Sequence, residues 1–179
     1  MTLQPPTNAD LDAVTAQLGR RPRGVIAIAA RCPAGHPSVI ASGGLQRHGD
    51  RLVPFPTLYW LTCRQLVRAV SRLEMRGLIA ELEQELAADP ELLRQLAEDH
   101  RDYARSRWEL LAPEDREAAR AAGLTDDLQQ RGIGGLVKWN TVKCLHLHVA
   151  HHLAAHNALG ALVCARFGVQ PCTGEPAGG

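Results

Sequence analysis

The stretch KCLHLHVAHHLAAH, residues 143–156, concentrates side chains that bind metals or transfer protons. It holds one cysteine and five of the eight histidines of the 179-residue chain. Thiolate sulfur and imidazole nitrogen are ligands that zinc and other borderline-soft metals prefer. On a helix that turns about 100° per residue, His148 and His151 share a face with Cys144. The stretch therefore predicts one side of a metal site, or of a site centred on a thiolate.

This segment alone does not complete a metal site, because structural zinc sites take four ligands. Cys32 and Cys63 are the best further candidates, since each ends a predicted strand and strand ends can meet in a folded sheet. The predicted site, which would hold zinc or iron, combines three thiolates with one imidazole: Cys32, Cys63, Cys144 and His151. His146 and His148 are the alternatives to His151.

Two other interpretations of these residues stay open. In the first, residues 143–156 form a partly exposed amphipathic helix, and histidines such as His152 and His156 are polar surface groups that bind nothing. In the second, Cys63 is a nucleophile, because a thiol at the start of a helix is biased toward thiolate. The phosphatase pattern of cysteine, five residues and arginine is absent after Cys63, since its sixth position is Ala69. Whether the protein is an enzyme stays undecided.

Four arginines recur every four residues in the helix predicted after Cys63: Arg64, Arg68, Arg72 and Arg76. This spacing places a basic stripe along one helix, drifting around its axis by about 120°. It favours a second hypothesis, a non-enzymatic module that binds a protein partner or RNA. The alternative is a solvated face paired with neighbouring acidic residues such as Glu74. A formal net charge of +1 gives no general electrostatic case for nucleic acid or an anionic membrane.

The elements that must position these groups change in character along the chain. Apolar, β-branched or aromatic segments predict strands over residues 23–32, 37–42 and 54–63, with a further short strand within 43–54. Helices are expected over 8–18, with Asn8 as the N-cap, and over 63–77, 78–89, 91–111 and 113–123. The charged middle helices predict an arm outside the core, and one long helix is expected from about Leu136 to Phe167. The fold class is therefore α+β, a small, mainly antiparallel sheet covered by helices.

Length and composition predict one domain over residues 1–167 and a flexible tail over 168–179. Five cysteines form an odd, widely spread set, which favours reduced thiols or metal ligands over a disulfide framework. Apolar runs such as 25–30 are far shorter than the roughly 20 residues of a membrane-spanning helix. The start of the chain lacks a secretory signal pattern. We therefore expect a cytoplasmic protein with no membrane segment.

The blocks PFPTLYWLTC, SRLE and VKCLHLHVAHHLA resemble an uncharacterised bacterial family, domain of unknown function 501. The resemblance runs from LGRRPRGV near the start to NALG near the end of the chain. It implies that residues matching Cys32, Cys144, His146 and His151 recur among members. At the position of Cys63 members carry Cys or Asp, an exchange that a metal ligand tolerates and a packing residue does not. The resemblance brings no established activity, substrate or cofactor.

The chain also departs from the pattern that the resemblance implies. His148 matches a position that is usually apolar, which counts against it as a ligand. Ala34 stands where some members carry a second cysteine, and Ala161 stands where an acidic residue is common. A ligand or anchoring role at these two positions is therefore not expected here.

Overall fold

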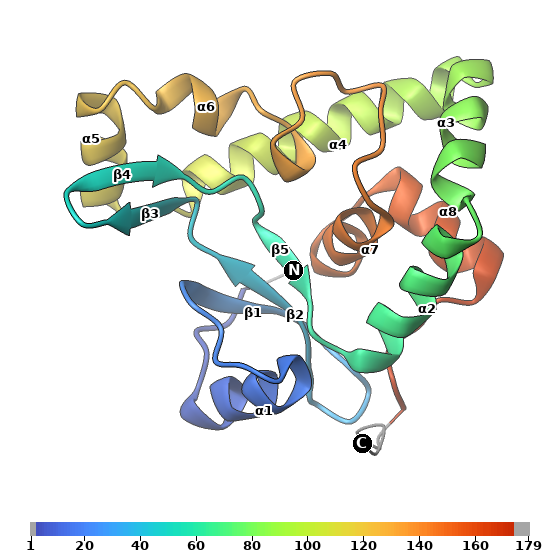
Figure 1. Ribbon diagram of the computed structural model, residues 1–179, viewed down its shortest axis with the longest axis horizontal. Helices are drawn as coiled ribbons and strands as arrows, with labels where there is room; N and C mark the ends of the chain where they lie inside the picture. Colours follow the sequence, from blue (N-terminus) through green and yellow to red (C-terminus); the bar gives the residue numbers. More distant parts are fainter. Residues whose placement is uncertain (1–2, 174–179) are drawn as a thin grey trace.

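The apolar segments of the first third of the chain form the sheets of the protein (Figure 1). The structure is a computed structural model in which residues 3–173 are described. Strands β1, β2 and β5 form an antiparallel sheet in that order, and β3 and β4 form a separate hairpin. The strands are β1 Val25–Arg31, β2 Pro37–Ser42, β3 Leu45–His48, β4 Arg51–Pro54 and β5 Tyr59–Leu61. The predicted α+β class is confirmed.

One helix precedes the strands, and the others follow them and make up most of the remaining chain. The helices are α1 Asn8–Leu18, α2 Arg64–Met75, α3 Leu78–Ala88, α4 Pro90–Glu109, α5 Pro113–Ala121, α6 Thr125–Gln129, α7 Leu145–Ala154 and α8 Ala158–Phe167, with a 3₁₀ turn η1 at Ile133–Gly135. The N-cap of α1 is Thr7 rather than Asn8, because the Thr7 side chain and Asp10 form a reciprocal capping box. No helix in residues 3–173 is long and apolar enough to cross a lipid bilayer.

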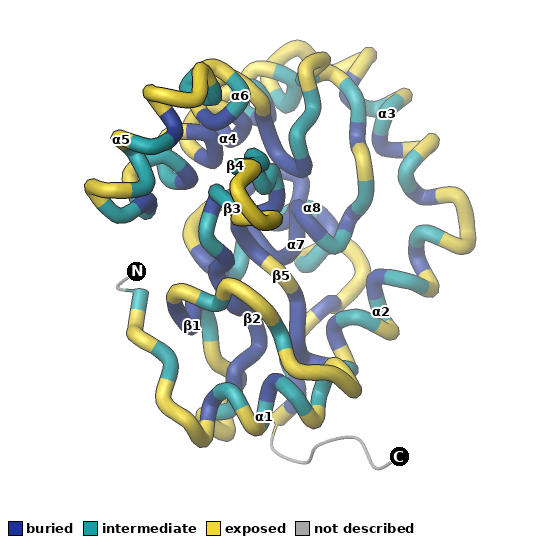
Figure 2. Tube along the Cα trace, turned by 60° about the vertical axis from the view of Figure 1, so that its left-hand side comes forward, coloured by how far each residue is buried: buried dark blue, intermediate teal, exposed yellow. Residues whose placement is uncertain are grey.

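Alternation along the strands divides the core between two faces of the sheet. Ile28 and Ile40 point to one face, where they pack with Val14 of α1. Their neighbours Ala27 and Ala41 point to the other face and join the main core, which includes residues of α7. The central strand β2 is buried along its whole length (Figure 2). The sheet is therefore covered on both faces, by α1 and by α7.

The middle helices do not form the predicted arm outside the core. Leu96, His100, Tyr103 and Arg107 of α4 are each fully buried. Their spacing of three or four residues places them on one side of the helix, and the charged residues occupy the other. The prediction was wrong because high charge on one face concealed a wide inward-facing stripe that includes a histidine, a tyrosine and an arginine.

The predicted long final helix is two helices, α7 and α8, separated at residues 155–157. Asn157 starts α8 as its N-cap, since its side-chain oxygen accepts a hydrogen bond from Gly160 N at 2.7 Å. The two helices then pack very closely, because a Cβ atom at Gly160 would lie 2.2 Å from the carbonyl oxygen of His148. Residues 136–144 are not helical.

The segment after α8 returns to the body of the protein. Val169 and Cys172 are both buried, at 5% and 9% exposure, although this segment falls within the predicted tail. Residues 174–179 of that tail lie outside the described part of the chain. The ordered fold therefore includes a cysteine beyond the last helix.

Candidate metal centre

Helix α2 separates the four predicted ligands into different places. Cys63 is its N-cap, whereas Cys144 lies beside Glu74 near its C-terminal end. With a rise of 1.5 Å per residue, the backbone positions of Cys63 and Glu74 are about 16 Å apart along the helix. His151 lies about 10 Å further along α7 than Cys144 by the same arithmetic. The four side chains therefore do not surround one point.

Near the C-terminal end of α2, the structure brings together three different kinds of metal ligand. Glu74, Cys144 and His146 each offer one atom, and these atoms all lie within 4.8 Å of one another. Among residues 3–173, no other three His, Cys, Asp or Glu side chains have their ligand atoms this close together. All three are partly buried, with the side chains of His146 and Glu74 27% and 22% exposed. We call Glu74, Cys144 and His146 the Glu–Cys–His cluster.

The start of α7 explains why these three side chains meet. Cys144 is the N-cap of α7 but makes no side-chain capping bond. The carboxylate of Glu74 takes that role, because its Oε1 accepts a hydrogen bond from Leu145 N at 2.6 Å. Negative charge is favoured at this end of a helix. A cysteine and a histidine at the first turn of α7 are thereby held against a carboxylate from α2.

Hydrogen bonds orient the histidine within the Glu–Cys–His cluster. His146 Nδ1 lies 3.1 Å from Glu74 Oε1, and its Nε2 lies 3.2 Å from the Ser71 hydroxyl oxygen. The carboxylate only accepts, so Nδ1 donates and Nε2 accepts from the hydroxyl in the neutral ring. If a metal bound Nδ1 in place of this proton, Nε2 would carry the proton and donate to the Ser71 oxygen, an outer partner of the kind that metal-binding imidazoles have.

The thiol of the cluster is neutral in the absence of a metal ion. Burial raises the pKa of Cys144, and the nearby carboxylate of Glu74 raises it further, against the opposing effect of backbone N–H groups. A bound cation reverses this preference, because coordination to a metal deprotonates a thiol outright. Lys143 adds positive charge nearby while its Nζ donates to Gly134 O at 2.7 Å.

At the other end of α2, Cys32 and Cys63 meet a third cysteine. Cys172 packs in the same core cluster as Cys32 and Cys63, and both of these thiols act on the pKa of its thiol. Cys32 follows the last residue of β1, Cys63 caps α2, and Cys172 comes from the segment after α8. The expectation that Cys32 and Cys63 lie close together fits this arrangement, while Cys144 and His151 lie elsewhere.

His151 belongs to a buried network and not to either cysteine cluster. Its ring stacks on Tyr59 at 5.6 Å between centroids and meets Tyr103 edge to face at 5.0 Å. The Asn157 amide nitrogen lies 3.4 Å from His151 Nδ1. Burial, followed by the positive charge of neighbouring histidines, lowers the pKa of His151 to about 3. His148, the alternative ligand, is fully buried in the same network, with its pKa lowered by burial to about 4.

The arginine stripe divides into one structural and three exposed residues. Arg64 caps the end of α1, because its guanidinium donates to the carbonyl oxygens of Ala16 and Gln17 at 2.6 and 3.0 Å. Arg68, Arg72 and Arg76 are exposed. None of these three takes part in an ion pair within residues 3–173.

Sequence reasoning missed Glu74 and Cys172 as members of these clusters. Glu74 carries no signal as a ligand, since it lies 70 positions before Cys144 and the two meet only through the packing of α2 against α7. Cys172 lies in a stretch rich in Gly and Pro, a composition typical of a loose tail. The one available signal was the odd cysteine itself, placed after the last apolar helix.

Comparison with known proteins gives the family of the chain and nothing about its chemistry. No curated protein and no solved structure matches it. The family described as "Protein of unknown function (DUF501)" matches residues 28–165. That range contains both ends of α2, the whole of α7 and every member of the Glu–Cys–His cluster. The chain therefore belongs to the DUF501 family.

Proposed function

We propose that this protein binds a zinc ion through Glu74, Cys144 and His146. The observation that carries the proposal is the meeting of a carboxylate, a thiol and an imidazole from two helices within 4.8 Å. Zinc accepts oxygen, sulfur and nitrogen ligands together, at about 2.0–2.3 Å. Calcium and magnesium favour sites made of oxygen alone, so this ligand set excludes them as the preferred ions. Iron is the second candidate metal.

A site with three protein ligands keeps one coordination position open. Zinc sites of this kind are typical of catalysis, because the metal lowers the pKa of a bound water and polarises substrates. The cluster residues are partly exposed, which gives solvent access to that position. Ser71 would orient His146, and Lys143 would supply positive charge near the thiolate. We propose that the site acts in the bacterial cytoplasm, since free cysteines suit a reducing compartment.

The competing interpretation is that Glu74 only caps α7. Its bond to Leu145 N satisfies one backbone group of the helix start and needs no metal. The two interpretations differ in what a neutral isostere does. Glu74→Gln keeps an oxygen that accepts the same backbone hydrogen bond, but it removes the anionic ligand. Metal binding would fall while the stability of α7 is largely retained.

The test is elemental analysis of protein purified anaerobically, followed by competition titration of zinc against a chromogenic chelator. We expect Glu74→Gln, Cys144→Ser and His146→Gln each to weaken zinc binding by more than the roughly 10–100-fold that loss of an outer-shell partner costs. Glu83→Gln is the matched control, because Glu83 Oε1 also accepts a backbone hydrogen bond, from Val142 N at 2.8 Å, without a cysteine or histidine ligand beside it. Unchanged zinc affinity in all three cluster variants would overturn the proposal.

The exposed arginines support a second candidate function, the binding of an anionic partner. Arg68 and Arg72 lie on α2 and Arg76 caps its end, all without an ion pair in the described residues, so their charges are available to a protein or to RNA. We expect Arg68→Glu combined with Arg72→Glu to abolish capture of such a partner and to leave zinc content unchanged. Pull-down from bacterial lysate with this double variant and with Arg105→Glu as control measures the effect. Equal capture by all three proteins would exclude the stripe as a binding surface.

A further inference from the structure

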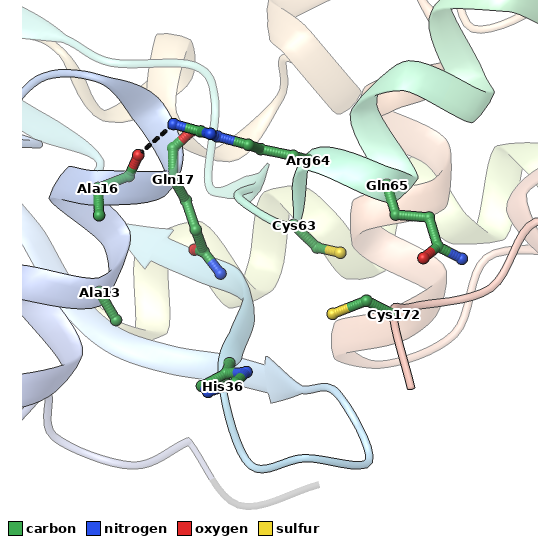
Figure 3. A pocket seen from close by; sticks show the side chains of 8 residues that line it. All are labelled: Ala13, Ala16, Gln17, His36, Cys63, Arg64, Gln65 and Cys172. Carbon is green, nitrogen blue, oxygen red and sulfur yellow. Dashed lines mark hydrogen bonds between the residues drawn. The ribbon is translucent and has the colours of Figure 1, made fainter. Parts of the chain in front are cut away.

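Three segments that are distant in the sequence bring Cys32, Cys63 and Cys172 together beside a cavity. The cavity has a volume of about 300 Å³, and Cys63 and Cys172 form part of its wall. Figure 3 shows the sulfur atoms of these two residues pointing toward each other, one from the start of α2 and one from the segment after α8. Cys32 completes the group, because it packs in the same core cluster and its thiol also raises the pKa of Cys172. We call these three residues the thiol cluster.

From this convergence we infer that the thiol cluster is a second metal site, which takes up a zinc ion through three thiolates with the fourth position facing the cavity. The inference goes beyond the Glu–Cys–His cluster and does not depend on it. Three thiolates suit a thiophilic metal, and zinc–thiolate sites are built from cysteines of separate segments in this way. The metal would fasten the end of the described chain to the sheet and to α2.

The binding reaction replaces three S–H bonds by three S–Zn bonds and releases three protons to solvent. Without metal the Cys172 thiol remains protonated, because burial, followed by contact with the two neighbouring thiols, raises its pKa to about 12. Three thiolates around Zn²⁺ leave one net negative charge. Arg64 lines the same cavity, but Figure 3 shows its guanidinium turned away from the two sulfur atoms and bonded to Ala16 O, so this charge is left to the solvent at the cavity.

The segment that carries Cys172 can shift to bring the thiol cluster around a metal. The three sulfur atoms are less closely grouped than the ligand atoms of the Glu–Cys–His cluster, which all lie within 4.8 Å of one another. Cys32 and Cys63 are fixed by the backbone, since Cys32 N donates to His36 O at 2.9 Å and Cys63 starts α2. Cys172 lies outside any helix or strand. A small shift of its segment would bring the third sulfur into coordination distance.

The simplest alternative is that these cysteines are small core residues, a common role for buried thiols. That role accounts for Cys32 and Cys63, which are 4% and 2% exposed in the main core. Cys172 belongs to the same core at 9% exposure, so metal binding by the three thiols, and not their burial, distinguishes the two roles. Another alternative is a disulfide between Cys172 and one neighbour, which needs an oxidant and forbids coordination by both sulfurs.

Cobalt(II) substitution tests the inference, because sulfur-to-cobalt charge-transfer absorption grows with the number of thiolates bound. Protein is reduced, freed of metal and titrated anaerobically with Co²⁺ and then with Zn²⁺. In the wild type we expect an intense band from the thiol cluster, in addition to a weaker one from the single thiolate of Cys144. Cys172→Ser should remove roughly the intensity of the thiol cluster and abolish one equivalent of zinc.

Two further variants separate this inference from the proposed function. Cys144→Ser should leave the intense thiolate band in place, and Cys164→Ser is the matched control, since Cys164 is half-buried on α8 and burial alone shifts its pKa. If Cys172→Ser retains the full band and the full zinc content, the inference is wrong, whatever Cys144→Ser does. Loss of two hydrogen masses on air exposure of the metal-free wild type, with no cobalt band under reduction, would also overturn it in favour of a disulfide.

Discussion

His100 and His148 lie edge to face in the core, with ring centroids 6.3 Å apart, and the hydrogen bonds of each ring fix its tautomer. His100 Nδ1 accepts a hydrogen bond from Ile133 N at 2.9 Å, so its Nε2 carries the proton. Asn157 Oδ1 accepts from Gly160 N, which fixes the amide, and therefore His148 Nδ1 donates to it and Nε2 is bare. Both Nε2 atoms are buried without another partner among the described residues. The fold therefore holds each of the two rings as one neutral tautomer.

This relationship predicts a loss of stability in mild acid. Burial lowers the folded-state pKa of His100, His148 and His151 to about 3, 4 and 3, below the value of 6.5 for an ordinary histidine. The free energy of unfolding that depends on these three histidines being neutral is therefore fully present above pH 6.5. It is lost as the pH falls toward 4. Asp99 acts in the opposite direction, because burial raises its pKa to about 6 and the folded state keeps its proton. Between these pKa values the unfolded state binds about two more protons than the folded state, three on the histidines less one on Asp99. The free energy of unfolding should therefore fall by about 2–3 kcal/mol per pH unit.

Urea unfolding measured between pH 7 and pH 4.5 checks this slope. His148→Gln should flatten it by about one proton, because one buried histidine is removed. His48→Gln is the control, since His48 is exposed in the β3–β4 hairpin. A slope identical in wild type and His148→Gln would show that His148 is not kept neutral by the fold.

Removal of the buried Arg107 side chain should greatly lower the free energy of unfolding. Its guanidinium is fully buried and donates to carbonyl oxygens of α6, of the segment after α6 and of the segment before β5: Leu128, Arg131, Gly132 and Pro56. Arg107→Ala would leave several of these carbonyls unpaired and a void beside Gly44. We expect a loss of about 3–5 kcal/mol in the free energy of unfolding. Arg105→Ala, two residues earlier and exposed, should change it by less than about 1 kcal/mol.

The Tyr103 side chain accepts backbone hydrogen bonds at the start of β5, as a neighbouring strand would. Its hydroxyl oxygen accepts hydrogen bonds from Leu58 N at 2.6 Å and from Tyr59 N at 3.3 Å. Tyr103→Phe would leave both backbone groups buried and unpaired, at a cost of about 1–3 kcal/mol. Native-state hydrogen exchange should show faster exchange at Leu58 and Tyr59, with little change at Val39 in the centre of the sheet. Unchanged protection at Leu58 would show that another acceptor takes over.

Substitution of Gly160 should destabilise the protein, because α7 and α8 pack closely at this residue. Gly160→Ala would place a methyl group 2.2 Å from the carbonyl oxygen of His148 and 2.7 Å from His152 Cβ. The helices must separate to admit it, and overpacking of this kind costs typically about 1–3 kcal/mol or more. Ala165→Gly, on the exposed side of the same helix, should cost only about 1 kcal/mol. Thermal unfolding of both variants measures the difference, and a smaller loss for Gly160→Ala would contradict the close approach.

Local patterns were enough to predict the fold class and the strands. The segments ending at Cys32 and Ser42 form paired strands because alternating apolar residues serve two faces of one sheet. The break between α7 and α8 could not be read in the same way. The sequence from Leu145 to Phe167 contains no proline and a single glycine, and its turn depends on Asn157 as a cap and on Gly160 as a contact with another helix.

The candidate ligands were recognised by type but not by grouping. Cys144 and His146 were named because cysteine and histidine are ligands, and Cys32 with Cys63 because both end strands. Their grouping depends on the length of α2, which places Cys63 and Glu74 at opposite ends. Helical angle also favoured His151 over His146, but the angle says nothing about which side of α7 is filled by aromatic rings. Tertiary packing decided this, with Tyr59 and Tyr103 taking the face of His151.

Helix α2 thus acts as a spacer of fixed length. The direction in which each of its side chains points is as important as its composition. Inserting one alanine in its middle would lengthen it by about 1.5 Å and rotate everything after the insertion by about 100°. The carboxylate of Glu74 would swing away from α7, while the first turn and Cys63 would keep their places. Evolution of this chain can therefore vary many side chains on the outer surface of α2 but not its number of residues.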